Sequence, residues 1–118
     1  MRYLPDHPLC FVMLDYGGLH FAAERDVADM TREGVIADIL AGTFTRRPNA
    51  DHVQVSTLLA VFECDMRTGA ACNVTAEIAS DVRDTWADAG EELADWQKNF
   101  IADHLGAAAL ARFEREFA

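Results

Sequence analysis

The dipeptide Gly17-Gly18 stands between two apolar segments, residues 11–16 and 19–24. A two-residue hairpin turn needs backbone angles with positive φ, which glycine adopts without steric cost. The pattern therefore predicts a β-hairpin. Because side chains alternate between the two faces of a strand, one face gathers the apolar residues and should face the core. That face comprises Cys10, Val12, Leu14, Tyr16, Leu19, Phe21 and Ala23.

A short amphipathic helix is expected after this hairpin. Asp26 and Thr31 are both suitable N-caps for it, and Gly42 suits its C-terminal end. If Thr31 is the cap, residues 26–30 form a separate turn. The apolar stripe of the helix consists of Val35, Ile36, Ile39 and Leu40.

Residues 52–64 are expected to form a long strand. From Leu58 onward both faces of this segment are apolar, which is typical of a central or covered strand. Apolar residues alternate with other residues along this segment. These apolar residues are Val53, Val55, Leu59 and Val61.

The sequence Arg-Thr-Gly at residues 67–69 suits a three-residue hairpin loop, in which a type I turn is closed by a glycine bulge. A second β-hairpin is therefore predicted. Its register would place Cys64 opposite Cys72 and Phe62 opposite Val74.

The rest of the chain is predicted to be helical, with Gly90 and Gly106 as helix ends. We expect an α+β fold in the order ββ-α-ββ-α-α-α, with a small antiparallel sheet of two β-hairpins and helices packed on one face. The linker-like stretch 42–51 is short, so a single domain over residues 1–118 is expected. The predicted helices span 76–89, 92–105 and 107–117.

Twenty acidic residues stand against ten basic ones, which gives a formal net charge of −10 at pH 7. Nucleic acids and anionic membrane surfaces should repel this charge, so we expect neither direct nucleic-acid binding nor membrane binding. The longest apolar runs, residues 9–14 and 58–62, are far shorter than the ~20 residues of a membrane helix. We therefore expect a cytoplasmic protein. Its single lysine and many alanines are typical of a GC-rich bacterial, plasmid or phage genome.

Several carboxylates recur at helical spacing from residue 77 onward. At about 100° per residue the first four lie within roughly 60° of one another, on a different arc from Ile78, Val82 and Trp86. They should therefore face outward. Three more acidic residues extend this surface to the N-terminus of the next predicted helix, where negative charge is favourable. The seven residues are Glu77, Asp81, Asp84, Asp88, Glu91, Glu92 and Asp95.

This acidic surface has four interpretations. It is a solvated face that promotes solubility, a docking surface for a basic protein partner, an imitation of a nucleic-acid backbone, or a divalent-cation site. The first four acids span about 16 Å in steps comparable to phosphate spacing, as an inhibitor of restriction or CRISPR enzymes would need. The sequence has no EF-hand loop, and we expect no metal site.

Asp15 lies opposite His20 in the predicted hairpin and is the best acid/base pair in the sequence. A carboxylate beside an imidazole stabilises its protonated form and fixes its tautomer. This hairpin face is therefore an alternative small-ligand or catalytic site, and a cross-strand surface pair is the simpler interpretation. The sequence lacks phosphate-loop, G-x-S-x-G, H-E-x-x-H and C-x-x-C motifs, and we expect neither enzymatic activity nor a cofactor.

Three cysteines are too few and too scattered for a disulfide framework or a zinc site. In a reducing cytosol they should be free thiols, with a redox-sensing pair of Cys64 and Cys72 as the alternative.

The last predicted helix carries Leu110, Phe113 and Phe117 on one face. These side chains either pack onto the protein itself or dock into a partner or a second copy of the chain. A homodimer is therefore an open alternative. A competing dimer surface is the outer face of the sheet, formed by Leu58, Ala60 and Phe62.

We hypothesise a non-catalytic interaction or regulatory module that binds a basic partner surface through its acidic residues. The nucleic-acid imitator and the ligand site at Asp15 and His20 stay as alternatives.

Overall fold

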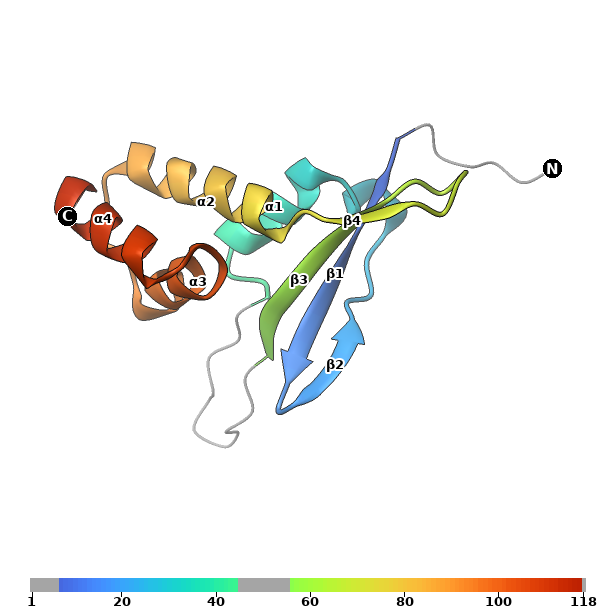
Figure 1. Cartoon of the computed structure of the whole chain (residues 1–118), viewed down its shortest axis with the longest axis horizontal. Helices are drawn as coiled ribbons and strands as arrows, with labels where there is room; N and C mark the ends of the chain where they lie inside the picture. Colours follow the sequence, from blue (N-terminus) through green and yellow to red (C-terminus); the bar gives the residue numbers. More distant parts are fainter. Residues whose placement is uncertain (1–6, 45–55, 118) are drawn as a thin grey trace. The chain divides into compact units, whose positions relative to one another are not determined.

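The structure, a computed structural model, describes residues 7–44 and 56–117. The chain divides into two compact units, Met1–Val74 and Thr75–Ala118. The first unit holds the sheet and α1, and the second holds three helices (Figure 1). The expected α+β class and order of elements are confirmed, with one short 3-10 helix in addition. A single domain stays a prediction.

The four strands form one antiparallel sheet in the order β2-β1-β3-β4. β1 and β3 are therefore the central strands, and β2 and β4 lie at the edges. The helix α1 contacts β1. The elements of this unit are β1 (Leu9–Tyr16), β2 (Leu19–Ala22), η1 (Val27–Asp29), α1 (Arg32–Leu40), β3 (Ser56–Cys64) and β4 (Ala71–Asn73).

The first predicted hairpin is confirmed, and Asp15 pairs with His20 in the expected register. Gly17 and Gly18 have φ angles of 59° and 90°, as the tight turn requires. The side chain of Tyr16 lies outside the described part of the structure. On β1 the predicted core face is otherwise confirmed, because alternate residues of the strand are buried. These residues are Cys10, Val12 and Leu14.

On β2 the predicted core face is wrong. Leu19 is 71% exposed and Phe21 is 43% exposed. Figure 1 shows α1 at the end of the sheet opposite to the β1–β2 turn. The short edge strand β2 therefore extends beyond the part of the sheet that α1 covers.

A β-bulge in β3 changes which of its residues face the core. Met13 pairs with Ala60 but Leu14 pairs with Leu58, so Leu59 has no partner in β1. Such an extra residue reverses the alternation of side chains beyond it. Leu58 is buried and Leu59 is 40% exposed. The predicted alternation is therefore wrong at Leu59, and Leu58 does not belong to the outer face.

The second hairpin forms, but its predicted register is wrong by one residue. Glu63 pairs with Cys72 and Cys64 pairs with Ala71. The Asp65 N–H donates to the Ala70 carbonyl oxygen at 2.8 Å, so the loop spans four residues instead of three.

The side chain of Asp65 explains this longer loop. Its Oδ1 accepts a hydrogen bond from the Arg67 N–H at 2.9 Å, which starts the turn at Asp65. A one-residue shift moves every side chain to the other face of a strand. Cys64 and Cys72 therefore lie on opposite faces of the sheet and cannot act as the predicted cross-strand pair.

Thr31 is the N-cap of α1, which confirms one of the two N-caps that the sequence predicted. Its Oγ1 accepts a hydrogen bond from the Gly34 N–H at 3.0 Å. Asp26 instead precedes the separate turn η1. Of the predicted apolar stripe, Val35 and Ile39 are buried, so periodicity correctly identified the packed side of this helix.

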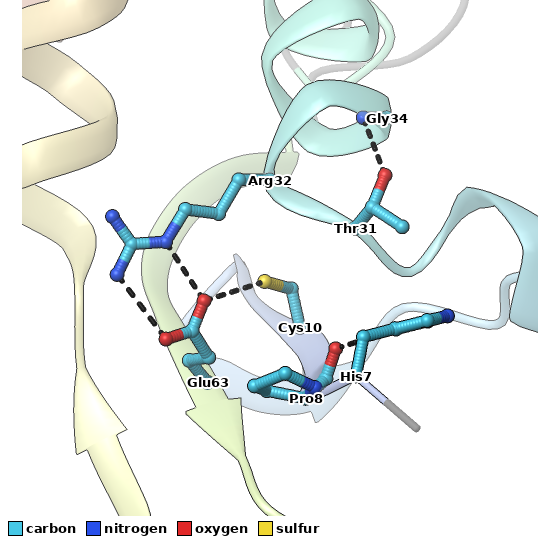
Figure 2. Close-up of polar contacts among 7 residues, drawn as sticks. All are labelled: His7, Pro8, Cys10, Thr31, Arg32, Gly34 and Glu63. Carbon is cyan, nitrogen blue, oxygen red and sulfur yellow. Dashed lines mark hydrogen bonds and ion pairs between the residues drawn. The ribbon is translucent and has the colours of Figure 1, made fainter. Parts of the chain in front are cut away.

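An ion pair fastens α1 to the sheet (Figure 2). The Arg32 Nε donates to a Glu63 carboxylate oxygen at 2.7 Å, and Nη2 reaches the other oxygen at 3.2 Å. The Cys10 thiol donates to the same carboxylate across 3.9 Å. Burial, together with the negative charge of Glu63, raises the pKa of the Cys10 thiol. Cys10 is therefore a protonated core residue and not a nucleophile.

The second unit consists of α2 (Thr75–Ala89), α3 (Asp95–Leu105) and α4 (Ala107–Phe117). α3 contacts both α2 and α4. The ring of Trp86 lies 5.6 Å from that of Trp96 and 5.8 Å from that of Phe100, edge to face in both cases. Such aromatic pairs fix the packing of α2 against α3.

The predicted start of α3 is wrong by three residues. Gly90 has a φ of 68° and ends α2, and Glu91 and Glu92 then lie in a loop. The Gln97 Oε1 accepts a hydrogen bond from the Ala94 N–H at 2.6 Å, which is half of a capping box. This cap sets the helix start at Asp95.

The predicted beginning of the long strand, with Val53 and Val55, lies outside the described residues.

Gly34 is expected to be indispensable in α1. A Cβ atom at this position would lie 2.3 Å from the Asp29 carbonyl oxygen. Alanine normally favours a helix over glycine by about 1 kcal/mol, but overpacking typically costs about 1–3 kcal/mol. We therefore expect Gly34→Ala to lower the free energy of unfolding in urea. A more stable Gly34→Ala variant would show that the contact between η1 and α1 is loose.

The ion pair between Arg32 and Glu63 predicts a pH-dependent stability. The hydrogen bond from Arg32 lowers the pKa of Glu63 below its ordinary value of 4.5. A carboxylate of this kind stabilises the fold above its unfolded-state pKa, and the contribution is lost as the pH falls through the folded-state pKa. Glu63→Gln should therefore lower the free energy of unfolding at pH 7 by on the order of 1 kcal/mol.

The measurement is urea unfolding of the wild-type protein and Glu63→Gln at pH 7 and at pH 3. The difference between them should shrink at pH 3. Glu33→Gln is the matched control, because Glu33 is exposed on α1 and should change the stability little at either pH. If Glu63→Gln lowered the free energy of unfolding equally at pH 7 and at pH 3, the predicted dependence of stability on the ionisation of Glu63 would be wrong.

Candidate functional site

The acidic face consists of Glu77, Asp81, Asp84, Asp88, Glu91, Glu92 and Asp95, and all seven residues are exposed. On the other arc of α2, Ile78, Val82 and Trp86 are buried. The helix is therefore oriented as its apolar spacing predicts. The carboxylates of its acidic stripe point to solvent while its apolar side chains pack.

Most of the acidic face lacks a counter-charge among the residues that the structure describes. The Arg83 guanidinium donates to the Asp84 Oδ1 from Nε at 3.1 Å and from Nη2 at 2.9 Å. Neighbouring residues on an exposed helix form such pairs with little net stabilisation. Within residues 7–44 and 56–117, five of the seven acids form no ion pair. These are Asp81, Asp88, Glu91, Glu92 and Asp95.

The acidic face has two parts with different geometry. The four carboxylates of α2 follow one line at helical spacing, whereas Glu91 and Glu92 lie in the loop before α3. Only Asp95 lies in the first turn of α3. The prediction that all three residues occupy the N-terminus of that helix is therefore wrong for Glu91 and Glu92.

Asp15 and His20 lie side by side, but on an open surface. The His20 Nε2 is 4.0 Å from the Asp15 Oδ1, and their side chains are 56% and 37% exposed. The same Asp15 oxygen accepts the Gly18 N–H at 3.0 Å. Asp15 thus stabilises the turn, and the exposure of both groups weighs against their use as a catalytic pair.

The C-terminal helix α4 is only partly available for a partner. Phe113 is buried, with 4% of its surface exposed, and Leu110 is half-buried. Phe117 belongs to α4, but its side chain lies outside the described part of the structure. The burial of Phe113 favours packing within the chain over docking of this helix into a second copy.

Two classes of site have no counterpart in the described part of the chain. None of its helices has the length and apolar character to cross a membrane. No group of three or more His, Cys, Asp or Glu side chains is arranged there to bind a metal ion.

Sequence reasoning missed a hollow of about 470 Å³ around Arg25 and Asp38 in the first unit. These residues are thirteen positions apart, and the guanidinium of one meets the carboxylate of the other only because η1 turns the chain back toward α1. No periodic signal marks such a contact. The excess of acids in residues 24–29 was the one available indication.

Comparison with known proteins adds no functional assignment, since no family model, curated protein or solved structure matches the chain.

The like charges of α2 should reduce its stability. Acidic pairs at i,i+3 or i,i+4 destabilise a helix by roughly 0.2–0.5 kcal/mol each. Replacing Asp81 and Asp88 by Asn removes three such pairs and keeps the ion pair of Arg83 with Asp84. We expect this double variant to raise the free energy of unfolding by about 0.6–1.5 kcal/mol at low salt.

Urea unfolding at low ionic strength measures this gain, which should decrease in about 1 M salt because the charges are then screened within ~3 Å. The matched control is Asp103→Asn with Glu114→Gln. It removes the same charge from exposed positions that have no acidic neighbour three or four residues away. If the control variant gained as much free energy of unfolding, the reduced net charge, and not the removal of like-charged pairs on α2, would cause the stabilisation.

Proposed function

We propose that the protein is a non-catalytic interaction module that docks onto a basic surface of a partner protein through its acidic face. The observation that carries this proposal is the exposure of all seven carboxylates, five of them without an ion pair in the described residues. A partner rich in Arg and Lys would supply the missing counter-charges.

The described part of the chain does not relieve the repulsion among these acids. A stripe of like charges destabilises its own helix, and Asp88 adds a negative charge beside the C-terminal end of α2, where the helix dipole disfavours it. Complementary charge on a partner would offset both effects on binding. It would also accelerate association, because oppositely charged surfaces steer each other together.

The chemistry of the cysteines supports a reducing, cytoplasmic setting for this module. All three are free thiols, and Cys10 is buried. Free cysteines are usual in compartments where glutathione and thioredoxin keep thiols reduced.

The test is affinity capture from a bacterial lysate with mass-spectrometric identification, at about 0.1 M and about 1 M salt. Electrostatic interactions between exposed charges are screened beyond ~10 Å at the lower salt concentration and beyond ~3 Å at the higher one. We expect a partner that is retained at the lower salt concentration and released at the higher one. Replacing Glu77, Asp81, Asp84 and Asp88 by Lys should abolish its capture.

A matched control reverses four exposed acids elsewhere, namely Glu33, Asp103, Glu114 and Glu116. It changes the net charge equally and should leave capture intact. A milder triple variant, Glu77→Gln with Asp81→Asn and Asp88→Asn, covers the case in which the reversed helix does not fold. Capture that survives in every acidic-face variant, with helix content unchanged by circular dichroism, would refute the proposal.

Adding duplex DNA to the capture distinguishes two kinds of basic partner. A partner that DNA displaces uses its nucleic-acid-binding surface, which is the outcome expected of a nucleic-acid imitator. A partner that stays bound offers a separate basic surface. Both outcomes support docking through the acidic face.

A further inference from the structure

The strand β2 has an open outer edge. It is the last strand on its side of the sheet, so no other strand in the described part of the chain pairs with that edge (Figure 1). Its sequence, Leu-His-Phe-Ala, is exposed at all four positions. It contains no Lys or Pro, which commonly protect a sheet edge, and the β-bulge of this sheet lies between β1 and β3. The edge of β2 is therefore accessible to a further strand.

The backbone of His20 and Ala22 faces this open edge. The Ala23 N–H donates to the Val12 carbonyl oxygen at 2.8 Å, so the backbone of Ala23 faces β1. Along a strand the backbone groups face the two neighbouring positions alternately, which turns the N–H and C=O groups of residues 20 and 22 outward. Within the described residues these groups form no hydrogen bond. An added strand would find two donors and two acceptors there.

Leu19 and Phe21 make one face of this edge apolar. Their side chains are 71% and 43% exposed, and as alternate residues they point to the same face of the sheet. Phe21 pairs with Leu14, which is buried. An added strand would therefore extend the buried face of the sheet over both exposed side chains.

The opposite edge of the sheet offers less. The strand β4 has three residues, and none of them has a large apolar side chain. Pairing at β4 would bury little apolar surface, so β2 is the favourable edge for an added strand.

The charges near the two ends of β2 select the occupant. Glu24 follows the strand, is exposed and forms no ion pair within the described residues. Asp15 lies at the other end, where its Oδ1 accepts the Gly18 N–H. A second copy paired antiparallel at this edge would bring Glu24 of each chain to the turn of the other, near Asp15, and like charges would meet. A segment with a basic residue at each end instead meets a carboxylate at each end.

We propose that the edge of β2 binds an extended segment of a partner protein, which adds to the sheet as a fifth strand. Alternate apolar side chains of this segment pack on Leu19 and Phe21. A Lys or Arg at either end pairs with Glu24 or Asp15. In this mode of recognition the backbone hydrogen bonds supply affinity, and the side chains at alternate positions supply specificity. The edge belongs to the first unit, so this interaction is separate from the acidic face on α2.

Nuclear magnetic resonance titration of the full chain with the peptide acetyl-Lys-Val-Thr-Val-Thr-Val-Lys-amide tests the proposal. When its central valine lies opposite Phe21, its lysines lie opposite Gly18 and Glu24. A concentration of about 5 mM nearly saturates a site with a Kd of about 0.5 mM. We expect shifts of backbone amides within residues 19–24. At ten times the Kd only about a tenth of the protein is free, so solvent exchange of the His20 and Ala22 amides should slow roughly tenfold.

Two control peptides separate strand addition from other contacts. Replacing both threonines by proline keeps the charge and the valines but removes the two N–H groups that would bond to β2. This peptide should cause no shifts within residues 19–24. Replacing both lysines by glutamate should weaken binding about fivefold or more. Equal binding of the threonine and proline peptides, or absence of shifts within residues 19–24, would overturn the proposal.

A variant of the protein tests the apolar contact. Leu19→Thr keeps a β-branched strand residue and should weaken binding of the lysine peptide by about fivefold. Met66→Gln is the matched control, because Met66 is an exposed apolar residue of the other hairpin, and should leave the affinity unchanged. Equal weakening by both variants would overturn the proposal.

Two further outcomes would assign the edge or the peptide differently, and each would overturn the proposal. Shifts within residues 19–24 that depend on protein concentration without peptide would mean that a second copy occupies the edge. Shifts confined to residues 75–95 would mean that the lysines bind the acidic face, which leaves the proposed function of that face intact.

Discussion

The antiparallel pairing of β1 with β3 is the contact on which the first unit depends. It joins segments about fifty residues apart and places Val12 opposite Val61, both fully buried. Contacts between distant segments form only after a large loss of chain entropy, so they must bury apolar surface to be stable. The two edge strands and α1 add to this central pair. The ion pair of Arg32 with Glu63 then ties α1 to β3, the strand that has no direct hairpin connection to β1.

The sequence of β3 is apolar on both faces, and the bulge at Leu59 determines which of its apolar residues face the core. Without it, Leu58 and Val61 would point in opposite directions. With one extra residue in β3, both are buried and Leu59 is exposed. The core of this sheet is thus selected by pairing with β1, and the remaining apolar side chains of β3 are left on the surface.

Two groups of acidic residues give the protein its chemical character, and they arise differently. On α2 the acids are gathered by helical periodicity, which requires no tertiary contact beyond burial of the opposite arc. Around Arg25 the acids are gathered by the turn η1 and by the reach of one guanidinium to Asp38. The first arrangement presents an extended charged line suited to a macromolecular surface. The second presents a concave site of molecular size.

The sequence by itself determined most of the local structure. Glycines with positive φ, the Thr31 cap and apolar spacing predicted the first hairpin, α1, α2 and α4, and the outward orientation of the acids on α2. These features depend on interactions within a few residues, which sequence patterns encode directly. The start of α3 was missed because acidic residues suit both a first helical turn and a loop, and only the Gln97 side chain distinguishes them.

Only the tertiary structure decided the strand order, the bulge at Leu59, the register of β4 and the hollow around Arg25. Each of these depends on contacts between residues far apart in sequence or on the length of a single loop. A loop of three residues and one of four are nearly equal in their local sequence requirements, yet they put Cys72 on opposite faces of the sheet. Likewise, the sequence shows that Arg25 and Asp38 are charged, but their pairing requires the chain to fold back through η1.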